Sequence, residues 1–269
     1  MKITTLLENT TKRPGLSAEH GLSLYIETAG RRILFDMGQT DLFSRNAAAL
    51  GIDLAAVDIA VLSHGHYDHG GGLSCFLAQN STAPVYVNRH AFEPHYHGTT
   101  KYIGLDTALM HHKQLVFTEG DTVLADGITL HSCDHAERRH DPGAFGLTRL
   151  EDGVFYPEDF RHEQYLLIEE SRRKILFSGC SHRGVLDIVD WFRPDVLIGG
   201  FHFSKLPLDD TLRSYAEYLD RFPTQYYTCH CTGTQQFAFM KHHMRHLHGL
   251  SCGDIVHIQS PFPRPILPS

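Results

Sequence analysis

Four side chains that commonly bind metals stand within six residues, in the order H-x-H-x-D-H. They are His64, His66, Asp68 and His69. The cluster follows a short apolar run at residues 59–62 and opens into three glycines at 70–72. Side chains two residues apart in an extended segment point the same way, so the first two histidines can converge on one ion. The aspartate and the third histidine follow where the chain turns, and can face a second ion beside the first.

The ligand types indicate which metals this cluster suits. Neutral imidazole and carboxylate groups bind zinc, iron or manganese, whereas calcium requires mostly oxygen ligands. Structural zinc sites often use pairs of cysteines at C-x-x-C spacing, and the cluster has none. The alternative is a histidine-rich surface loop, an interpretation that suits one histidine better than four ligands in this order. We therefore expect two divalent ions, zinc first with iron or manganese as alternatives, and metal-activated water chemistry.

Two further apolar segments end in small-residue turns with ligand-competent side chains. One leads to Cys180 and His182, and the other leads to His230. A free cysteine is most often a buried small hydrophobe. The position of Cys180 after a strand and close to a histidine favours a metal ligand instead. We therefore expect the ends of three strands to supply one site.

Other cysteines and histidines are expected to have no part in the site. The six cysteines are irregularly spaced, which favours free thiols in a reducing compartment over a disulfide framework. Cys229 and Cys231 flank His230 and should point to the opposite face of an extended segment, so we expect packing residues. Among the 21 histidines, those outside the motifs, such as His95, are expected to be solvated polar positions.

Composition and charge favour an enzyme. The chain has 269 residues, 42% hydrophobic and 20% charged, a balance typical of a folded domain. Its net charge of −7 argues against a general nucleic-acid binder. It has no apolar stretch near the ~20 residues of a membrane-spanning helix and no signal peptide at its start, so we expect a cytoplasmic protein without a membrane partner. The expected partners are a small-molecule substrate and, as an open option, further copies of the chain in a homo-oligomer.

The elements that must position the ligands form two similar halves. Helices are predicted at residues 41–50, 73–79, 184–192, 208–222 and 237–247. Strands are predicted at residues 3–7, 22–28, 32–36, 59–62, 85–88, 114–118, 122–125, 128–132, 164–170, 174–177, 196–199, 225–229 and 253–259. Residues 94–113 and 134–161 are predicted to be loops, and a loop as long as the second is usually functional or mobile. Strands with helices outside them predict an α/β (α+β) fold in which two mixed sheets lie face to face, flanked by helices.

The same pattern indicates one domain. No linker rich in proline, glycine or serine interrupts residues 1–260, so we expect a single domain there. Residues 261–269 contain several prolines and cannot continue a helix or a central strand, so we expect a C-terminal tail.

These motifs together resemble those of the metallo-β-lactamase-fold superfamily. Within it, the chain is similar to the branch of metal-dependent hydrolases related to 7,8-dihydropterin-6-methyl-4-(β-D-ribofuranosyl)aminobenzene 5'-phosphate synthase. The resemblance runs through most of the chain. It includes residues 19–23, 33–39 and 50–53, the H-x-H-x-D-H motif, residues 163–166, S-G-C-S-H at 178–182 and H-C-T-G at 230–233. It implies an αββα sandwich, the metallo-β-lactamase fold, with a two-metal site at one edge between the sheets.

The resemblance also assigns ligands. It places the superfamily's first metal motif on His64, His66, Asp68 and His69. It makes His230 the last histidine ligand. Cys180 occupies the place where many relatives carry a metal-bridging aspartate, which leaves the bridging ligand open.

The middle histidine ligand of the superfamily has no clear counterpart. Its usual turn is missing from this sequence, so His182 is the first candidate for that place, and Asp134 or His135 is the second. Asp36 matches an aspartate that closes an early strand, and we expect it to hold loop amides or a histidine ring beside the metals.

The expected mechanism is hydrolysis by a hydroxide that two ions, about 3.5–4 Å apart, activate together. Asp68 or His20 would move the proton, although a hydrogen-bonding turn position suits His20 equally well. The loop at 134–161 would line the substrate pocket. Three arginines in it, Arg138, Arg139 and Arg149, are candidates to grip a phosphate or carboxylate, although solvated surface charge is the commoner role for each.

Several functions remain open on the sequence alone. The favoured one is a hydrolase for a small ester-like substrate, such as a phosphoester or a pterin-related molecule. The alternatives are a pterin-related synthase or condensing enzyme, a redox protein with non-haem iron, and a non-enzymatic metal-dependent ligand sensor. Redox di-iron relatives carry an attached flavin domain, for which this chain has no room. The fold alone does not decide among the others.

Overall fold

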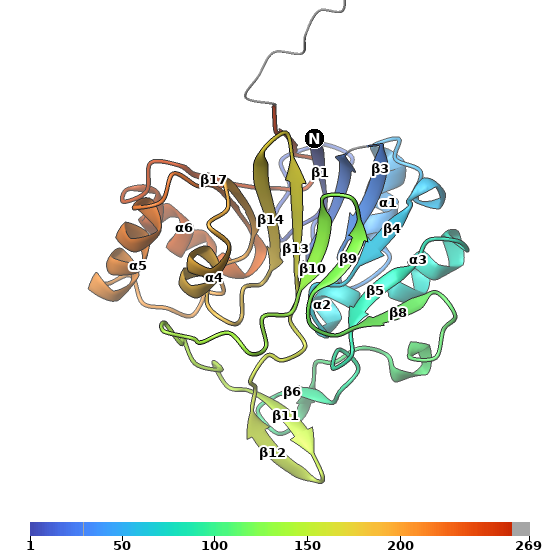
Figure 1. The fold of residues 1–269 in the computed structure, drawn as a ribbon, viewed down its shortest axis with the longest axis horizontal. Coiled ribbons are helices and arrows are strands. Elements are labelled where there is room, and N and C mark those ends of the chain that lie inside the picture. Colours follow the sequence, from blue (N-terminus) through green and yellow to red (C-terminus); the bar gives the residue numbers. More distant parts are fainter. Residues whose placement is uncertain (29, 260–269) are drawn as a thin grey trace, which may run out of the picture.

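Two seven-stranded sheets pack face to face in the computed structural model, with helices on their outer faces (Figure 1). The structure describes residues 1–28 and 30–259, so the expected tail at 261–269 lies outside the described residues. This arrangement confirms the predicted sandwich of two mixed sheets. Among the described residues, no helix is long and apolar enough to cross a membrane.

The first sheet has the strand order β18-β1-β2-β3-β4-β5-β8. Its strands are β1 (Lys2–Leu7), β2 (Ser23–Thr28), β3 (Arg31–Phe35), β4 (Ile59–Val61), β5 (Val85–Asn88), β8 (Leu115–Thr118) and β18 (Ile255–His257). Strands β3, β4, β5 and β8 run parallel, whereas β18, β1, β2 and β3 pair antiparallel. Because β3 and β4 are parallel, the residues that follow them reach the same edge of the sheet.

The second sheet has the order β17-β16-β15-β14-β13-β10-β9. Its strands are β9 (Thr122–Ala125), β10 (Ile128–His131), β13 (Tyr165–Glu170), β14 (Arg173–Gly179), β15 (Val196–Gly199), β16 (Gln225–Thr228) and β17 (Leu247–Gly249). Strands β14, β15, β16 and β17 are parallel. The carboxyl ends of these four strands therefore also lie together.

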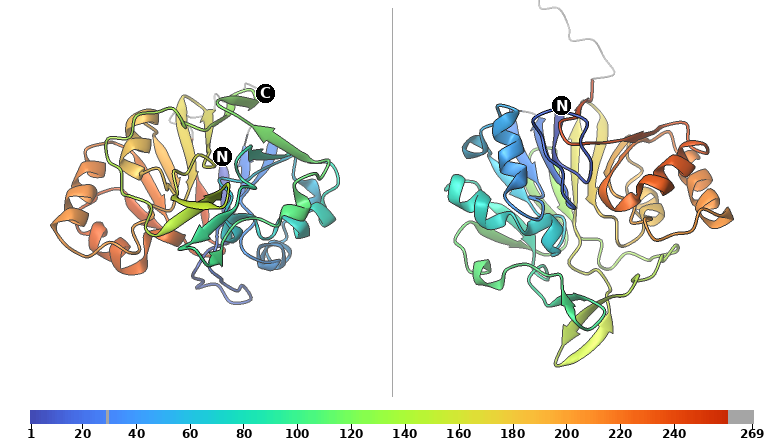
Figure 2. Two further views of the ribbon diagram at one scale, coloured as in Figure 1. Left: turned by 90° about the horizontal axis from the view of Figure 1, so that it is seen from below. Right: turned by 180° about the vertical axis from the view of Figure 1, so that it is seen from behind.

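Helices cover the outer face of each sheet (Figure 2). The helices are α1 (Leu42–Ala49), α2 (Tyr67–Gly70), α3 (Leu73–Gln79), α4 (Val185–Phe192), α5 (Asp210–Asp220) and α6 (Thr234–Lys241), with single 3-10 turns at Leu54–Ala56, Thr107–Leu109 and His230–Thr232. Helices α1 and α3 lie on the first sheet, and α4, α5 and α6 lie on the second.

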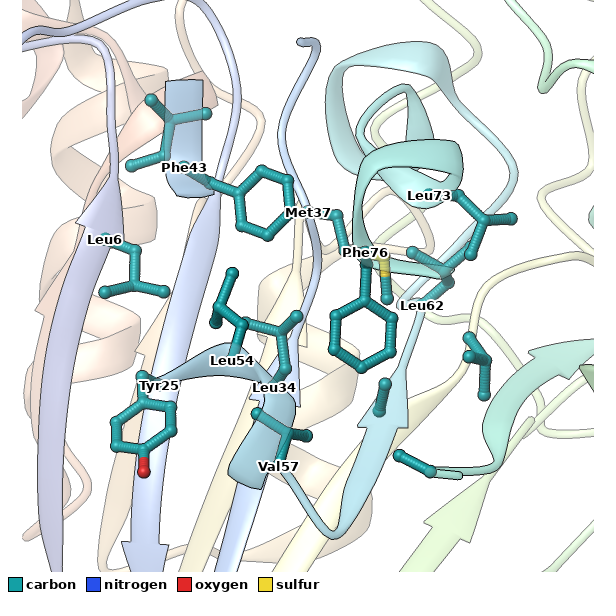
Figure 3. Close-up of a cluster of buried hydrophobic side chains, with 14 of the residues drawn as sticks. Leu6, Tyr25, Leu34, Met37, Phe43, Leu54, Val57, Leu62, Leu73 and Phe76 are labelled. Carbon is teal, nitrogen blue, oxygen red and sulfur yellow. The ribbon is translucent and has the colours of Figure 1, made fainter. Parts of the chain in front are cut away.

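Buried apolar side chains form a layer between the sheets and one under each set of helices. Phe35 and Phe177 meet in the middle layer with their ring centroids 5.7 Å apart. Figure 3 shows the layer between the first sheet and its helices, where Phe43 and Phe76 are completely buried. Burial of each such side chain contributes roughly 1.5–3 kcal/mol, so these layers hold the strand ends in place.

A small third sheet, with the order β12-β11-β6-β7, corrects the two loop predictions. Its strands are β6 (His95–His97), β7 (Lys101–Tyr102), β11 (Leu147–Glu151) and β12 (Val154–Pro157). Strand β6 pairs with β11, about fifty residues away, and such a pairing leaves no local pattern in the sequence. The β11–β12 hairpin did carry a signal, because Asp152 and Gly153 have positive φ values of 51° and 79°, typical of a D-G hairpin turn.

The helix predicted at 237–247 is also wrong in part. Helix α6 begins earlier and ends at Lys241, and the segment after it forms the edge strand β17. Strand β17 pairs in parallel with β16, so its conformation depends on a neighbour that local periodicity does not show.

Candidate metal centre

Strand ends from both sheets meet at one edge of the sandwich and bring the predicted ligands together. Strand β4 leads into residues 63–70, called here the metal loop, which includes the short helix α2. In the second sheet, β14 leads into Cys180 and β16 leads into His230. The backbone around the site is unusual, because Asp36, Ser181 and His230 all have left-handed φ values, between 50° and 60°. Such conformations in non-glycine residues cluster at functional sites.

Three histidines form the first group. His64, His66 and His182 each place one ring nitrogen within 4.8 Å of the others. All three are nearly completely buried. The Nε2 atoms of His64 and His182 lie 3.3 Å apart. The structure thus brings His182, the first candidate for the middle histidine, to the two histidines of the H-x-H motif.

The hydrogen-bond partners of His64 show which of its nitrogens is free. The Ser63 hydroxyl donates to Asp36 Oδ2 at 2.8 Å, because a carboxylate can only accept. The Ser63 oxygen, 2.8 Å from His64 Nδ1, must therefore accept the Nδ1 proton of His64. The Nε2 of His64 consequently carries a lone pair, which faces His182.

A second group contains an aspartate, two histidines and a thiol. The Nδ1 of His69 donates to Asp36 Oδ2 at 2.6 Å, which leaves its Nε2 directed at Cys180 Sγ, 3.1 Å away. Asp68 Oδ2 lies 3.2 Å from His230 Nε2 and 4.0 Å from His69 Nε2. Cys180 also belongs to a triad with His64 and His69, so its sulfur lies between the two groups.

The contact between His230 and Asp68 fits a cation held between them. The Asn9 Oδ1 atom accepts a hydrogen bond from the Gly21 amide, so it also accepts the Nδ1 proton of His230 at 2.8 Å. The Nε2 of His230 then carries a lone pair that faces Asp68 Oδ2. This nitrogen is buried and has no hydrogen-bond partner. Two facing acceptors repel each other unless a positive ion lies between them. The residues present therefore fit a metal centre, in which outer acceptors orient the inward nitrogens of His64, His69 and His230.

Burial keeps the first group in the form that binds metals. It lowers the pKa of His64, His66 and His182 well below the usual value, and the neighbouring histidines lower it further. Neutral imidazole is the metal-binding form, so these three rings are ready to bind a cation near neutral pH.

The second group is polarised by its carboxylates. Burial alone would raise the pKa of Asp68, but the neighbouring imidazoles of His20 and His230 outweigh it and hold that pKa well below the usual value. Burial alone would lower the pKa of His69, but the charge and hydrogen bond of Asp36 outweigh it and raise that pKa. His20 lies 3.1 Å from Asp68 Oδ2 with a side chain that is 56% exposed, so it links this carboxylate to solvent.

Several residues that support the site were not predicted. Glu163 is buried and accepts the backbone amides of His182 and Arg183 at 2.7 and 3.0 Å, which fixes the turn after Cys180. His162 Nδ1 accepts the amide of Gly65 at 2.9 Å, inside the H-x-H motif. The sequence placed this histidine and glutamate immediately before the strand predicted at residues 164–170, and the glutamate begins a segment that carries the family resemblance.

The expectation that His95 is solvated is wrong. Its ring is completely buried, donates from Nδ1 to Glu158 at 2.7 Å, and stacks on His162 with centroids 3.9 Å apart. One nitrogen each of His66, His95 and His162 lies within 4.8 Å of the others. Because the Nδ1 of His162 already accepts a hydrogen bond, its Nε2 carries the proton and cannot bind a metal. This group is therefore a buried support for the metal loop.

The expectation that Cys231 only packs is also wrong. Its sulfur lies within 4.8 Å of ligand atoms of Cys180 and His202 and lines the cavity. The segment does not stay extended after β16: it turns at His230, whose φ is 50°, and this brings the next side chain to the same side.

Other predicted candidates lie away from the site. The side chain of His135 is 97% exposed, and Asp134 accepts a hydrogen bond from Ser132, so neither completes the metal groups. The candidate arginines pair with local carboxylates instead of facing the cavity. Arg138 pairs with Asp141, Arg139 with Glu137, and Arg149 with Glu151.

A cavity of about 680 Å³ opens over the metal groups. Its lining includes Asp68, Cys180, His182 and His230. Ile103, Leu147 and Phe237 give it apolar walls, and further lining residues come from the loops after β1 and β15. A space of this size holds a small organic molecule in contact with both groups.

Comparison with known proteins identifies the family. The sequence profile of the metallo-β-lactamase superfamily matches residues 17–221. The chain belongs to the metallo-β-lactamase superfamily. The crystal structure of Tm1679, a metal-dependent hydrolase of the β-lactamase superfamily, superposes with a TM-score of 0.83 at 28% identity, over 96% of this chain and 99% of that one.

Two relatives come from Methanocaldococcus jannaschii. An uncharacterized protein is 29% identical over 242 residues, which are 86% of this chain and 90% of the relative. The second relative is 7,8-dihydropterin-6-methyl-4-(β-D-ribofuranosyl)-aminobenzene-5'-phosphate synthase. It is 26% identical over 266 residues, which cover 89% of this chain and 90% of the relative. Both similarities extend over nearly the whole chain, in agreement with the resemblance in the sequence motifs.

Proposed function

We propose that the protein is a hydrolase that uses two divalent metal ions to cleave a small ester-like substrate. The observation that carries this proposal is the pair of facing acceptors at the floor of the cavity. The Nε2 lone pair of His230 faces Asp68 Oδ2 at 3.2 Å, and the Nε2 atoms of His64 and His182 lie 3.3 Å apart in the neighbouring group. The similarity to Tm1679, whose structure is described as that of a metal-dependent hydrolase, supports the same proposal.

The two groups of ligands would each hold one ion. The first is His64, His66 and His182, the second is Asp68, His69 and His230, and the sulfur of Cys180 would lie between them. Ions held there would supply a Lewis acid and lower the pKa of a water molecule to near neutrality. A thiolate among imidazole ligands favours zinc or iron over manganese.

The chain itself supplies proton transfer and substrate positioning. Asp68 is the carboxylate of the second group that lines the cavity, and His20 connects it to solvent, so this pair can carry a proton away from the reaction centre. The apolar side chains of Ile103 and Leu147 lie in the wall and can hold the non-reacting part of a small molecule. Glu163 fixes the turn that carries His182, so the site is rigid before substrate enters.

A second candidate is a pterin-related condensing reaction. It is supported by the similarity to the methanogen synthase, which extends over 89% of this chain. In such a reaction the same cations would stabilise charge without net addition of water. Product analysis separates the two: a joined product that contains the pterin would favour condensation, and two fragments of an ester would favour hydrolysis.

The test combines elemental analysis with a substrate panel. Wild-type protein, reconstituted separately with zinc, iron and manganese, is assayed on a phosphodiester, a lactone and a thioester. We expect about two ions per chain and turnover of at least one substrate class. Asp68→Ala should lose metal and lower kcat by about 10²-fold or more, because it removes both a ligand and the proton acceptor.

Asp190→Asn is the matched control, because Asp190 is a partly buried carboxylate outside the cavity, bonded to Tyr218. It should keep both metal content and activity. Fewer than one ion per chain in the reconstituted wild type, or full activity in Asp68→Ala, would show that the proposal is wrong.

A further inference from the structure

One rim of the cavity carries two lysines and a histidine that have no carboxylate partner among the described residues. Lys101, Lys205 and His97 all line the cavity there. His97 stands directly opposite Lys101 in the β6–β7 pair, and Lys205 Nζ lies 3.4 Å from His97 Nε2. The other contacts of the lysines are the Phe145 carbonyl, 3.1 Å from Lys205, and the Tyr67 ring below Lys101. Across residues 1–28 and 30–259, neither lysine forms an ion pair.

Both lysines are attached to segments of the metal centre. Lys101 Nζ lies 5.6 Å from the centre of the Tyr67 ring, and Tyr67 stands in the metal loop between two proposed ligands. The Tyr67 amide donates to Ile103 at 2.9 Å, which ties the end of β7 to that loop. Lys205 follows His202, whose ring lies 4.2 Å from that of His182. Figure 1 shows β6 at the same end of the sandwich as α2. A group bound between the lysines would therefore lie beside the metal centre.

The uncompensated charge indicates what binds there. The protein has a net charge of −7, yet two ammonium groups and an imidazole gather here without a counter-ion. Several other cationic side chains among the described residues have carboxylate partners nearby, such as Arg161 with Glu93 and Arg245 with Asp220. Two ammonium groups match the charge of a phosphate monoester, which carries about −1.5 to −2 at pH 7. Lysine binds phosphate as a point charge and tolerates its rotation.

We propose that Lys101, Lys205 and His97 bind a phosphate monoester group of the substrate. This inference rests on the proposed function, because it assumes that the reacting bond lies at the metal centre. The phosphate is held and not cleaved, so the substrate carries a phosphate at one end and an ester-like bond a short distance away. The two lysines thus determine specificity, while the metal ligands determine the reaction.

Binding can be measured without knowing the substrate. The full-length, metal-loaded protein is titrated calorimetrically with inorganic phosphate and, in a separate arm, with succinate. In Lys101→Gln/Lys205→Gln, the Kd for phosphate should rise at least fivefold. Any phosphate that binds at the metal ions is common to all variants and cancels in the comparison. Lys12→Gln is the matched control, because Lys12 is an exposed lysine that lines the same cavity from the loop after β1. Its Kd should stay within twofold of wild type.

Each outcome decides the proposal. An unchanged Kd in the double variant, or an equal increase in Lys12→Gln, would overturn it, because the effect would then be absent or due only to general charge. Succinate that binds more tightly than phosphate and depends on the same lysines would overturn the phosphate assignment in favour of a carboxylate. Weaker phosphate binding in the double variant alone supports it.

Failure of the proposed function can be distinguished from failure of the anion site. A wild-type protein that cleaves no member of the ester panel but binds phosphate through the two lysines would refute hydrolysis and leave the anion site standing. If the enzyme cleaves a phosphorylated ester, the ratio of its kcat/KM to that for the matched unphosphorylated ester should fall about tenfold in the double variant. An unchanged ratio would refute the anion site and leave hydrolysis standing.

Discussion

Asp36, a single buried carboxylate, orients two of the proposed metal ligands. It accepts hydrogen bonds from the Ser63 amide and hydroxyl and from the Nδ1 of His69. Because the Ser63 hydroxyl donates its proton to Asp36, the Ser63 oxygen accepts the Nδ1 proton of His64. One residue outside the ligand set therefore determines which nitrogen of each ring faces the metal centre, as the match to an aspartate beside the metals led us to expect.

Asp36→Asn should weaken metal binding about 10–100-fold and lower the free energy of unfolding by about 3–5 kcal/mol. The amide has one acceptor oxygen in place of two, so either Ser63 or His69 loses its partner while buried. Asparagine tolerates the left-handed backbone that Asp36 adopts at φ 60°, so the change tests the carboxylate and not the turn. The measurements are competition with a chromophoric chelator and urea denaturation.

Asp58→Asn serves as the control, because Asp58 accepts from the amide of Arg32 on the exposed side of the same sheet. It should leave the metal affinity unchanged. Equal metal affinity in Asp36→Asn and wild type would mean that the rings are oriented without the carboxylate.

Residue types and spacing identified the proposed ligands but not the buried residues that support them. The H-x-H-x-D-H motif is local, so its members could be recognised together. His162 reaches Gly65 from 97 positions away, and Glu158 reaches His95 from 63 positions away. Cys231 enters the site only because the chain turns at His230. Contacts of this kind depend on tertiary packing and leave no spacing in the sequence.

At the scale of elements, the metal loop depends on one crowded glycine. Gly65 lies between the two histidines of the H-x-H motif, and a Cβ there would lie well under 3.0 Å from the backbone of Ala91. The amide of Gly65 is also held by His162 at 2.9 Å. The loop is therefore clamped from both sides, and its glycine is required by space and not by a positive φ.

Gly65→Ala should displace the metal loop, because backbone atoms of Ala91 cannot move aside as a flexible side chain could. We expect a loss of about 1–3 kcal/mol in the free energy of unfolding and at least a tenfold loss in metal affinity. Gly153→Ala is the comparison: it lies in the β11–β12 turn with nothing near its Cβ, and its φ of 79° costs on the order of 1 kcal/mol by strain alone. A similar loss of stability but retained metal affinity in Gly65→Ala would refute the clamp.

The same scale shows what local pattern can predict. Central strands such as β4 and β15 are short apolar runs with a turn at each end, so their positions and the residues after them were predicted correctly. The pairing of β6 with β11 and of β17 with β16 joins segments that carry no such pattern. The site was predictable because it lies at the ends of buried strands, whereas the cavity rim was not, because it lies on the small sheet.

At the scale of the whole molecule, the metal centre joins the two halves of the sandwich. The metal loop belongs to the first sheet, and Cys180, His182 and His230 belong to the second. Removal of bound metal with a chelator should therefore lower the Tm. Ligand present at about 1,000 times its Kd adds roughly 4 kcal/mol to the folded state, so a shift of several degrees is expected. Equal Tm values with and without chelator, measured by differential scanning calorimetry, would contradict a bridging centre.

The metal-free protein should also lose stability as the pH falls below the ordinary histidine pKa of about 6.5. The folded-state pKa values of His64, His66 and His182 are lowered by burial, so below pH 6.5 the unfolded chain takes up protons that the folded chain does not. The contribution of each ring is present above pH 6.5 and falls by up to about 1.4 kcal/mol per pH unit below it. His69 changes the stability in the opposite direction. Its raised pKa contributes stability at low pH, and that contribution is lost as the pH rises through the pKa of the folded state. The effect of the three rings with lowered pKa outweighs that of His69, so urea midpoints in the presence of chelator should fall from pH 7.5 to pH 5.5.

His182→Gln should flatten this decline, whereas His111→Gln, an exposed position outside the cavity, should not. A midpoint that is constant or rises toward pH 5.5 in the wild type would show that the buried histidines take up protons in the folded state and are not held neutral for metal.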